Sequence, residues 1–400
     1  MRVLIATRHL SIVGGVETYL RAVLPRLRDY GFDLAVLAEH GEPSGGVVSG
    51  VPGVPVWLAG AGAIAEVERW VPDVVYAHGL GDPNLEAALA DRFPTVLYAH
   101  NYQGTCVSGT KCQTRPEFAP CARVLGPGCL AAYLPRGCGG RNPVTMLSLY
   151  RSQRRSRSNL GRYRAVLVAS AHMAAEFRRH GAPEDRLRLV PLFPPDAVPD
   201  PKPPESRQRS DRVLFVGRVT VQKGLRHLIE AVPIASARIG RPLTLVVAGD
   251  GPDRGAAESE AKRHGVPVEF LGWVDSARRT GEMRGADVLL VPSVWPEPFG
   301  LVGVEAGCVG LPAVGYATGG IPDWLSPGVS GESAPGERPD PKELAAALVR
   351  ALSSEKHLQR LRVGAREMAA RFTPEAHLAQ LIDVFHAVSH AGRLAATGAK

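Results

Sequence analysis

Short apolar runs alternate with longer amphipathic stretches along most of the chain. In the first half the apolar runs cover residues 2–6, 33–39, 73–79, 95–100 and 165–170, and each is bounded by polar residues, Gly or Pro. Runs of this length that are rich in Val and Leu are typical of parallel strands buried on both faces. Most of the stretches between them, such as residues 16–31, have helical character. The alternation therefore predicts a βαβ pattern.

The pattern stops once and then starts again. Residues 190–211 contain seven prolines and end in polar and charged residues, which is typical of an interdomain linker. Beyond it, apolar runs recur at 212–218, 243–251, 268–274, 286–293 and 312–320. We expect an α/β protein with two Rossmann-like, doubly wound parallel-sheet domains facing a central cleft. The ligands of such sheets lie at the carboxyl ends of the strands.

The expected domain boundaries follow from this interruption. Residues 1–195 form the first domain, 196–211 the linker, and 212–373 the second domain. Residues 374–394 have helical periodicity, and we expect this helix to join the first domain. Residues 101–143 depart from the βαβ pattern and form an insertion within the first domain.

Composition and charge narrow the class of protein. The chain has 400 residues, of which 45% are hydrophobic and 22% charged, and it carries a net charge of +8. This composition is typical of a globular protein. The first ten residues read as a buried strand rather than a signal peptide, so we expect a cytoplasmic protein.

Residues 150–164 hold several arginines, which favours either a solvated helix face or peripheral contact with an anionic membrane. No nucleic-acid-binding motif accompanies them, so we expect no nucleic-acid partner.

Two glycine-rich turns follow predicted strands. Gly14 and Gly15 separate the first strand from a helix, where backbone N–H groups could approach a phosphate. Gly249 lies in a similar turn at the end of the run at 243–251. A tight turn without a ligand is an equally good interpretation of either one.

Cations and carboxylates cluster after strands of the second domain. Arg218 closes one strand and Lys223 precedes a helix, so both could neutralise a diphosphate leaving group. In "WPEPFGLVGVEAG" (295–307), Glu297 lies at a strand-to-helix junction. We expect the helix to begin near Phe299–Gly300, with Glu305 about two turns into it on the same side. Glu297 could then bind sugar hydroxyls and Glu305 a ribose. The alternative is a helix cap and a surface residue.

These segments together resemble a known family. "GGVE", "GRVTVQKG", "AGDGP", "LGWV" and "EPFGLVGVEAG" look like the motifs of the retaining glycosyltransferases of glycosyltransferase family 4, also called glycosyl transferases group 1. The resemblance covers essentially the whole chain and is strongest over about 212–330. It implies the GT-B fold and a nucleoside diphosphate sugar as co-substrate, with no requirement for a catalytic metal.

The resemblance also implies roles for individual residues. His100, Arg218, Lys223 and Glu297 match catalytic positions, with Glu297 contacting the donor sugar and His100 facing the reaction centre from the first domain. The matching donor-binding positions are Gly14, Gly15, Gly249, Trp273, Val274, Phe299, Gly300, Leu301 and Glu305. His78, which ends the preceding strand, is a weaker candidate than His100.

The insertion after His100 carries a cluster of cysteines: Cys106, Cys112, Cys121, Cys129 and Cys138. Clustered thiols in a reducing compartment favour a structural, zinc-like metal site over disulfides, although no CxxC pair is present. Disulfides and unlinked buried thiols are the alternatives. Because the insertion follows His100 directly, we expect it to shape an acceptor pocket.

The sequence therefore predicts a hexosyltransferase that retains anomeric configuration and transfers a sugar to an acceptor hydroxyl on a glycan, a lipid or a natural-product intermediate. The alternatives are a sugar-nucleotide epimerase or a phosphorylase on the same fold, and a non-catalytic sugar-nucleotide-binding protein.

Overall fold

The computed structural model describes residues 1–11, 14–41, 51–196 and 209–397. It divides into two compact units. The N-terminal unit contains the described parts of 1–111, 123–191 and 375–400, and the C-terminal unit those of 112–122 and 192–374. Most of the predicted linker, residues 197–208, lies outside the described residues, as do Ile12 and Val13 before the first glycine pair.

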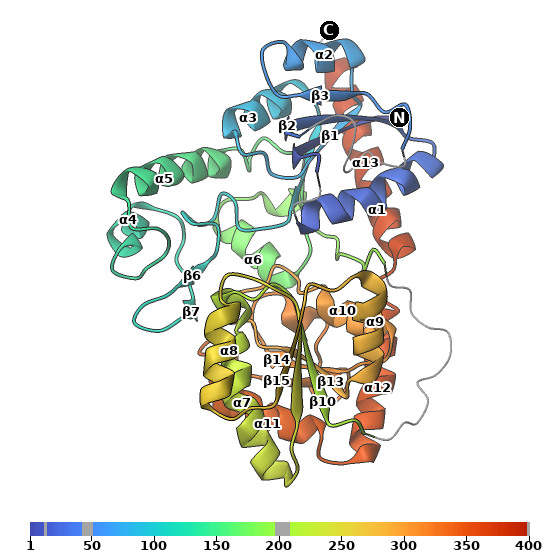
Figure 1. Cartoon of the computed structure of the whole chain (residues 1–400). Helices are drawn as coiled ribbons and strands as arrows, with labels where there is room; N and C mark the ends of the chain where they lie inside the picture. Colours follow the sequence, from blue (N-terminus) through green and yellow to red (C-terminus); the bar gives the residue numbers. More distant parts are fainter. Residues whose placement is uncertain (12–13, 42–50, 197–208, 398–400) are drawn as a thin grey trace. The chain divides into compact units, whose positions relative to one another are not determined.

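The N-terminal unit is built on a parallel sheet that has seven strands over the described residues (Figure 1). The strand order is β3-β2-β1-β4-β5-β8-β9. The bounds are β1 (Arg2–His9), β2 (Asp33–His40), β3 (Val56–Leu58), β4 (Val74–Ala77), β5 (Thr95–Ala99), β8 (Ala165–Val168) and β9 (Leu187–Leu189). The order reverses between β1 and β4, so the loops after these two strands open a crevice where ligands bind in doubly wound sheets.

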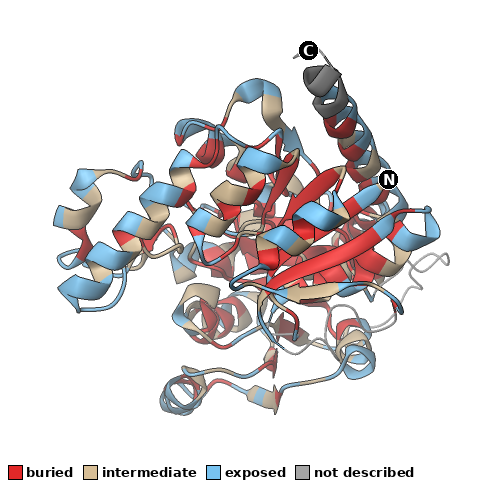
Figure 2. Cartoon of the chain, turned by 90° about the horizontal axis from the view of Figure 1, so that it is seen from above, coloured by how far each residue is buried: buried red, intermediate tan, exposed pale blue. Residues whose placement is uncertain are grey.

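The apolar runs form the inner strands of this sheet. All four residues of β4 and all five of β5 are buried, as expected for strands covered by helices on both faces. Figure 2 shows the same contrast, because the strands are largely buried while most helices alternate between buried and exposed positions.

Polar caps and proline define where several helices of this unit begin. Asp82, Asn142 and Ser170 each accept a hydrogen bond from a first-turn N–H group. The bounds are α1 (Gly15–Asp29), α2 (Ala63–Trp70), α3 (Pro83–Arg92), α4 (Pro127–Tyr133), α5 (Pro143–Ser158), α6 (Ala171–Arg179), the 3-10 helix η2 (Glu184–Arg186) and α13 (Pro374–Thr397).

The C-terminal unit contains a second parallel sheet, with six strands over the described residues in the order β12-β11-β10-β13-β14-β15. The strands are β10 (Arg212–Val216), β11 (Thr244–Ala248), β12 (Val268–Gly272), β13 (Val288–Val291), β14 (Ala313–Tyr316) and β15 (Gly331–Ala334). Here the order reverses between β10 and β13, which repeats the arrangement of the first sheet. Two doubly wound parallel sheets confirm the predicted fold class.

Helices of the C-terminal unit pack their apolar faces on this sheet. They are α7 (Leu225–Ile239), α8 (Arg254–Arg263), α9 (Ser276–Gly285), α10 (Val302–Cys308), α11 (Pro341–Ala351) and α12 (Glu355–Ala369), with 3-10 turns η3 (Val221–Lys223) and η4 (Ile321–Asp323). The core of the unit includes Leu228, Val247, Leu290 and Leu348, which are almost completely buried.

Part of the cysteine-containing insertion forms an antiparallel pair, β6 (Cys112–Gln113) and β7 (Ala119–Pro120). Phe118, beside β7, packs against the core of the C-terminal unit. Residues 112–122 of the insertion therefore belong to the C-terminal unit, and the rest of the insertion belongs to the N-terminal unit. Within the described part of the chain, no helix is both long and apolar enough to cross a membrane.

Candidate functional site

The loops on either side of the strand reversal bring Lys223 and Glu297 together in the C-terminal unit. Lys223 follows β10, whereas Glu297 follows β13. The Lys223 Nζ donates a hydrogen bond of 2.6 Å to Glu297 Oε1, and the Ser293 hydroxyl donates a second bond of 2.6 Å to the same oxygen. Glu297 is only 4% exposed, so its carboxylate is desolvated and held by charge-assisted hydrogen bonds.

A glycine next to Lys223 allows the two loops to approach each other. Gly224 has φ +71°, and a Cβ atom at this position would overlap the carbonyl oxygen of Pro292. The Val294 N–H group also donates to the Gln222 carbonyl, which ties the two loops together. A residue other than glycine would push the lysine loop away from the glutamate loop.

Arg218 lies in the same loop as Lys223, but the structure does not place it on a carboxylate. Its side chain is exposed and forms no ion pair with any described residue. The preceding Gly217 N–H donates to Ala248 O, and a Cβ atom at Gly249 would overlap Gly217 O. Gly249 therefore packs the turn after β11 against the turn that carries Arg218.

Glu305 has different partners from Glu297. Its Oε2 lies 3.6 Å from Arg279 Nε on α9, and Arg279 lies 3.7 Å from Asp196. Burial raises the pKa of Glu305, Arg279 lowers it and Asp196 raises it further. The predicted helix start was wrong: α10 begins at Val302, so Glu305 lies in its first turn rather than two turns in. Pro296 and Pro298, and the positive φ of Gly300, explain the later start.

The segment between the two glutamates is held by a tryptophan. Trp324 Nε1 donates to the carbonyl of Phe299, and the Phe299 ring is buried against Phe372. Gly300 and Leu301 are only half-buried. Trp273, which follows β12, is 80% exposed, an unusual exposure for so large an apolar side chain. Its neighbour Val274 is half-buried.

The glycine pair of the N-terminal unit lies at the start of α1. Gly14 is the N-cap residue, and its N–H donates to the buried carboxylate of Glu17 at 2.8 Å. A Cβ at Gly15 would meet nothing within 4 Å, so this side of the helix start is open.

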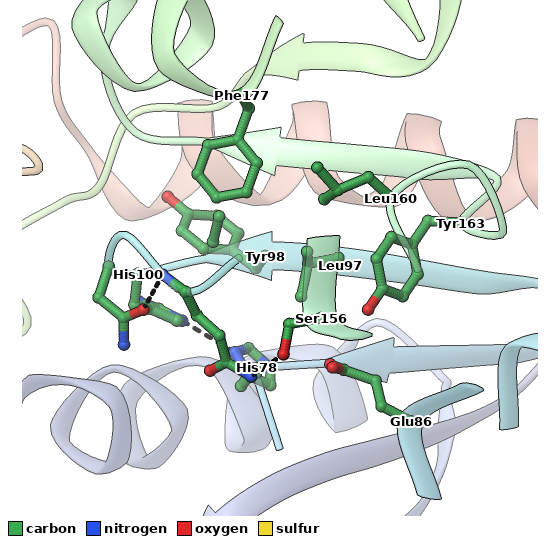
Figure 3. A pocket seen from close by; sticks show the side chains of 13 residues that line it. His78, Glu86, Leu97, Tyr98, His100, Ser156, Leu160, Tyr163 and Phe177 are labelled. Atoms are coloured by element: carbon green, nitrogen blue, oxygen red, sulfur yellow. Dashed lines mark hydrogen bonds between the residues drawn. The ribbon is translucent and has the colours of Figure 1, made fainter. Parts of the chain in front are cut away.

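His100 follows β5 and pairs with His78, which follows the neighbouring strand β4 (Figure 3). Nδ1 of His78 lies 2.9 Å from Nε2 of His100. Burial lowers the pKa of His78 well below its usual value and that of His100 to about 3. Both rings are therefore neutral at physiological pH, and only one of the two facing nitrogens carries a proton.

A chain of aromatic residues lies beside His100, and its proton positions can be assigned. His377 Nδ1 faces the carbonyl of Pro191 at 2.7 Å, so this nitrogen is the donor. The Nε2 atom of His377 must then accept from the Tyr19 hydroxyl at 2.7 Å, since burial lowers the His377 pKa to about 4 and keeps the ring neutral. The Tyr19 hydroxyl accepts in turn from Tyr76.

The five cysteines of the insertion are not gathered into a metal site. No group of three or more His, Cys, Asp or Glu side chains among the described residues is placed to hold a metal ion. Cys106 Sγ lies 3.5 Å from the Ser108 hydroxyl, and Cys129 and Cys138 interact with backbone carbonyls of Val124 and Ala132. Cys112 and Cys121 belong to the C-terminal unit, and the other three belong to the N-terminal unit. Cys129 and Cys138 instead pack against a hydrophobic cluster of Val107, Leu125, Tyr133 and Tyr150.

Two family models match the chain over most of its length. The model described as "Glycosyl transferase 4-like domain" matches residues 14–192, and the model described as "Glycosyl transferases group 1" matches residues 199–368. The chain belongs to the group 1 glycosyltransferases. This confirms the group 1 glycosyltransferase membership expected from the motifs.

Relatives and solved structures agree with this membership. The chain is 27% identical to the phosphatidyl-myo-inositol mannosyltransferase of Mycolicibacterium smegmatis, over 96% of this chain and 92% of the relative. It is 33% identical to the D-inositol 3-phosphate glycosyltransferase of Xylanimonas cellulosilytica, over 55% of this chain but only 56% of the relative. Several other matches span about a third of the relative's own length. The crystal structure of Anabaena HepE in complex with UDP has a TM-score of 0.68 at 19% identity, covering 97% of this chain and all of HepE, which supports the GT-B fold.

Three residues of this glycosyltransferase's candidate site were missed from the sequence: Ser293, Arg279 and Asp196. Ser293 ends the apolar run before Glu297, so its place at a strand end was a usable signal. Arg279 lies within a run of polar helix residues, and Asp196 within the predicted linker, so neither had a local signal. The arrangement as a whole offers a buried carboxylate, an ammonium group and an exposed guanidinium for a polyanionic, hydroxyl-rich ligand.

Proposed function

We propose that this protein is a retaining glycosyltransferase that moves a hexosyl group from a nucleoside diphosphate sugar to an acceptor hydroxyl. The observation that carries the proposal is the contact between Lys223 and the buried Glu297 across the strand reversal of the C-terminal unit. The contact fixes the ammonium group within 2.6 Å of the carboxylate that we assign to the sugar, so a single ligand that carries both phosphate and hydroxyl groups can reach both side chains.

The proposed donor site assigns a separate part of the ligand to each group. Arg218 and Lys223 bind the diphosphate, and their charge stabilises it as it leaves. Lys223 keeps donating to Oε1 of Glu297, while Oε2 accepts hydrogen bonds from sugar hydroxyls. The backbone around Phe299, Gly300 and Leu301 lies beside the sugar and phosphate.

The nucleoside occupies the other side of the proposed site. Glu305, oriented by Arg279, accepts hydrogen bonds from the ribose hydroxyls. The exposed indole of Trp273 and its neighbour Val274 lie beside the base. Burial of a side chain that is 80% exposed would stabilise the bound nucleotide through the apolar area removed from water.

In the proposed reaction the bond between the anomeric carbon and the phosphate oxygen breaks, and the acceptor oxygen bonds to the same face of that carbon. The acceptor proton passes to the departing phosphate oxygen, so atoms and charges balance without a covalent enzyme intermediate. The two cations stabilise the negative charge that develops on the diphosphate.

We place the acceptor on the N-terminal unit, where His100 follows β5 and Gly15 begins α1 after β1. A surface depression of about 740 Å³ at the carboxyl ends of β1 and β2 supports this placement. Its polar lining includes Arg8, Glu39, His40 and Asp82, which suits a hydroxyl-rich or phosphorylated acceptor. Inositol phosphates are the first acceptors to test, since two relatives are named for inositol-containing substrates.

We also propose that α5 binds an anionic membrane surface. Arg151, Arg154 and Arg155 are exposed along this helix, and Val144 and Leu147 are exposed apolar residues of its first two turns. In Figures 1 and 2 the α4–α5 segment extends away from the sheet of its unit. Vesicles that contain anionic lipid should sediment the protein at low salt, and replacement of the three arginines by glutamine should abolish this.

The catalytic proposal is tested by a panel of nucleoside diphosphate sugars with inositol phosphates and other polyols as acceptors. The expected product has the same anomeric configuration as the donor, and free nucleoside diphosphate appears only when an acceptor is present. Chelation of divalent metal with EDTA should leave the rate unchanged, because the two cations neutralise the diphosphate. An inverted product, or release of nucleotide that does not depend on acceptor, contradicts the proposal.

Matched variants locate the site within the protein. Lys223→Ala and Glu297→Gln should each abolish transfer. Arg226→Ala is the control, because Arg226 is an exposed cation only three residues from Lys223, and its partners are the half-exposed Glu230 and the largely buried Glu260 rather than Glu297. Turnover near the wild-type rate in either site variant would refute the assignment.

A further inference from the structure

A small polar cavity lies behind the histidine pair of the N-terminal unit (Figure 3). Its volume is about 20 Å³, which is room for one water molecule. The lining includes His78, His100, Glu86, Ser156 and Tyr163, which come from several different elements. Figure 3 shows the Glu86 carboxyl group and the Ser156 and Tyr163 hydroxyls directed toward the same space beside His78.

Two buried polar atoms that line this cavity have no hydrogen-bond partner among the described residues. They are Nε2 of His78, whose side chain is 4% exposed, and Oε1 of Glu86, whose side chain is 1% exposed. Each would cost about 1–3 kcal/mol if it stayed unsatisfied. One water molecule in the cavity can satisfy both atoms, since it can accept and donate hydrogen bonds.

We propose that an ordered water joins Glu86 to Nε2 of His78, and that the protonation state of Glu86 thereby sets which ring nitrogen of His100 carries the proton. Glu86 and His78 are positioning residues in this scheme, because they act on His100 rather than on a substrate. Only the consequence for sugar transfer rests on the function proposed above.

The direction of the coupling follows from the charge of Glu86, which orients the water. If Glu86 is ionised, the carboxylate attracts the hydrogens of the water and turns its oxygen toward His78, so the water accepts from His78 Nε2–H. His78 Nδ1 is then bare, so His100 must donate from Nε2, which leaves Nδ1 of His100 as an acceptor. If Glu86 is protonated, it donates to the water, and the water, no longer held by a negative charge, donates to Nε2 of His78. His78 then donates from Nδ1 to Nε2 of His100, and Nδ1 of His100 becomes a donor. The two states differ by the one proton that Glu86 takes up from solvent.

Glu86 titrates near neutral pH. Burial raises its pKa to about 7, hydrogen bonds from Tyr163 and the Leu80 backbone lower it, and the charge of Glu39 raises it. The titratable groups that face the histidine pair are Tyr19 on α1, Tyr76 on β4, Tyr98 on β5 and His377 on α13. Burial raises the pKa of each tyrosine, and His377 is neutral above pH 4, so these groups keep their charge near pH 7.

Imidazole ¹⁵N chemical shifts test the proposal directly, because a protonated and a bare ring nitrogen give different signals. Protein labelled with ¹⁵N-histidine would be titrated from pH 5 to pH 9, with the His100 signals assigned from a His100→Gln variant. The wild-type Nδ1 signal should change from protonated to bare as the pH rises through about 7. In Glu86→Gln, which has no titrating carboxyl group, the same signal should stay constant over this range.

Two further variants should move the transition in opposite directions. Tyr163→Phe removes a hydrogen bond that lowers the Glu86 pKa, so the midpoint should rise. Glu39→Gln removes a charge that raises it, so the midpoint should fall slightly. A wild-type transition that persists in Glu86→Gln, or midpoints that move in the reverse directions, would overturn the proposal.

A high-resolution crystal structure supplies an independent test of the water. Density for one water within hydrogen-bond distance of His78 Nε2 and Glu86 Oε1 supports the proposal, and an empty cavity refutes it. Failure of the proposed function is distinguishable. A protein that transfers no sugar but shows the coupled transition keeps this inference, whereas an active enzyme without the transition loses it.

Discussion

The contact between Lys223 and Glu297 makes a quantitative prediction about stability. Lys223→Met removes one of two donors to a carboxylate that is 4% exposed and leaves only the Ser293 hydroxyl. Removing the partner of a fully buried charge costs about 3–5 kcal/mol. The Lys223 side chain is 32% exposed, so water replaces part of the lost interaction. We therefore expect Lys223→Met to lower the free energy of unfolding by about 2 kcal/mol.

A double-mutant cycle with Glu297→Gln isolates the pairwise interaction from other effects of each substitution. Because the amide no longer needs a cation, Lys223→Met should cost little in the Glu297→Gln background. The expected coupling energy is about 1–2 kcal/mol. The measurement is urea-induced unfolding of the four proteins, followed by tryptophan fluorescence. Arg178 and Glu184 provide the control cycle, since their side chains are 51% and 68% exposed, and such a pair contributes about 0–1 kcal/mol.

The same variants separate the structural role from ligand binding. A charge-assisted hydrogen bond to diphosphate contributes about 1.5–3 kcal/mol, so Lys223→Met should weaken nucleoside diphosphate binding about 10- to 150-fold. A coupling energy no larger than that of the surface control would refute the reasoning for stability. Unchanged nucleotide affinity in a folded Lys223→Met protein would refute it for binding.

Three other changes have defined outcomes. The free energy of unfolding of Glu86→Gln, relative to that of wild type, should rise by about 3 kcal/mol as the pH rises from 4.5 to above 7. The reason is that the raised pKa of Glu86 stabilises the folded wild-type protein only below this range, and this stability is lost as the carboxyl group ionises. Urea unfolding of both proteins as a function of pH measures the difference. Gly224→Ala should lower the free energy of unfolding by about 3 kcal/mol or more, because the new Cβ overlaps the Pro292 carbonyl. Gly240 has a similar positive φ but open space around it, so Gly240→Ala should lower the free energy of unfolding by only about 1–2 kcal/mol. Equal losses in the two variants would contradict this prediction. Lys111→Met should cost about 3 kcal/mol, since it breaks a buried 2.8 Å pair with Glu176, and Arg178→Ala should cost almost nothing in the same thermal-unfolding assay.

The fold could be predicted because its main signals are local. Each inner strand is a short apolar run, and each run precedes a loop that was correctly placed at a carboxyl end. The strands β3, β9 and β15 were missed, because they are only three or four residues long and all three lie at sheet edges, where β3 and β9 are incompletely buried. The start of α10 was placed too early because proline and a positive-φ glycine delay the helix beyond its first apolar residues.

The candidate site, like the fold, could be predicted only in part from the sequence. Lys223, Glu297 and Glu305 could be chosen from motif spacing, but the partners Arg279 and Asp196 could not, since they meet Glu305 through contacts between separate elements. The expectation of a metal in the cysteine segment followed from the clustering of its cysteines and from the family resemblance. In the structure Tyr133 of this segment packs with Tyr150 of α5, and this packing depends on how α4 meets α5.

The sequence alone determined that two parallel sheets form and which loops carry charge, because burial on both faces of a strand leaves a pattern within a few residues. Only the tertiary structure decided that Lys223 touches Glu297, that His78 touches His100, and that Glu86 lies beside the cavity behind them. Lys223 and Glu297 are 74 positions apart, and His78 and His100 are 22 positions apart. Hydrogen bonds and desolvation act over a few ångströms of space, so charge pairing and proton placement are set by the packing of distant segments.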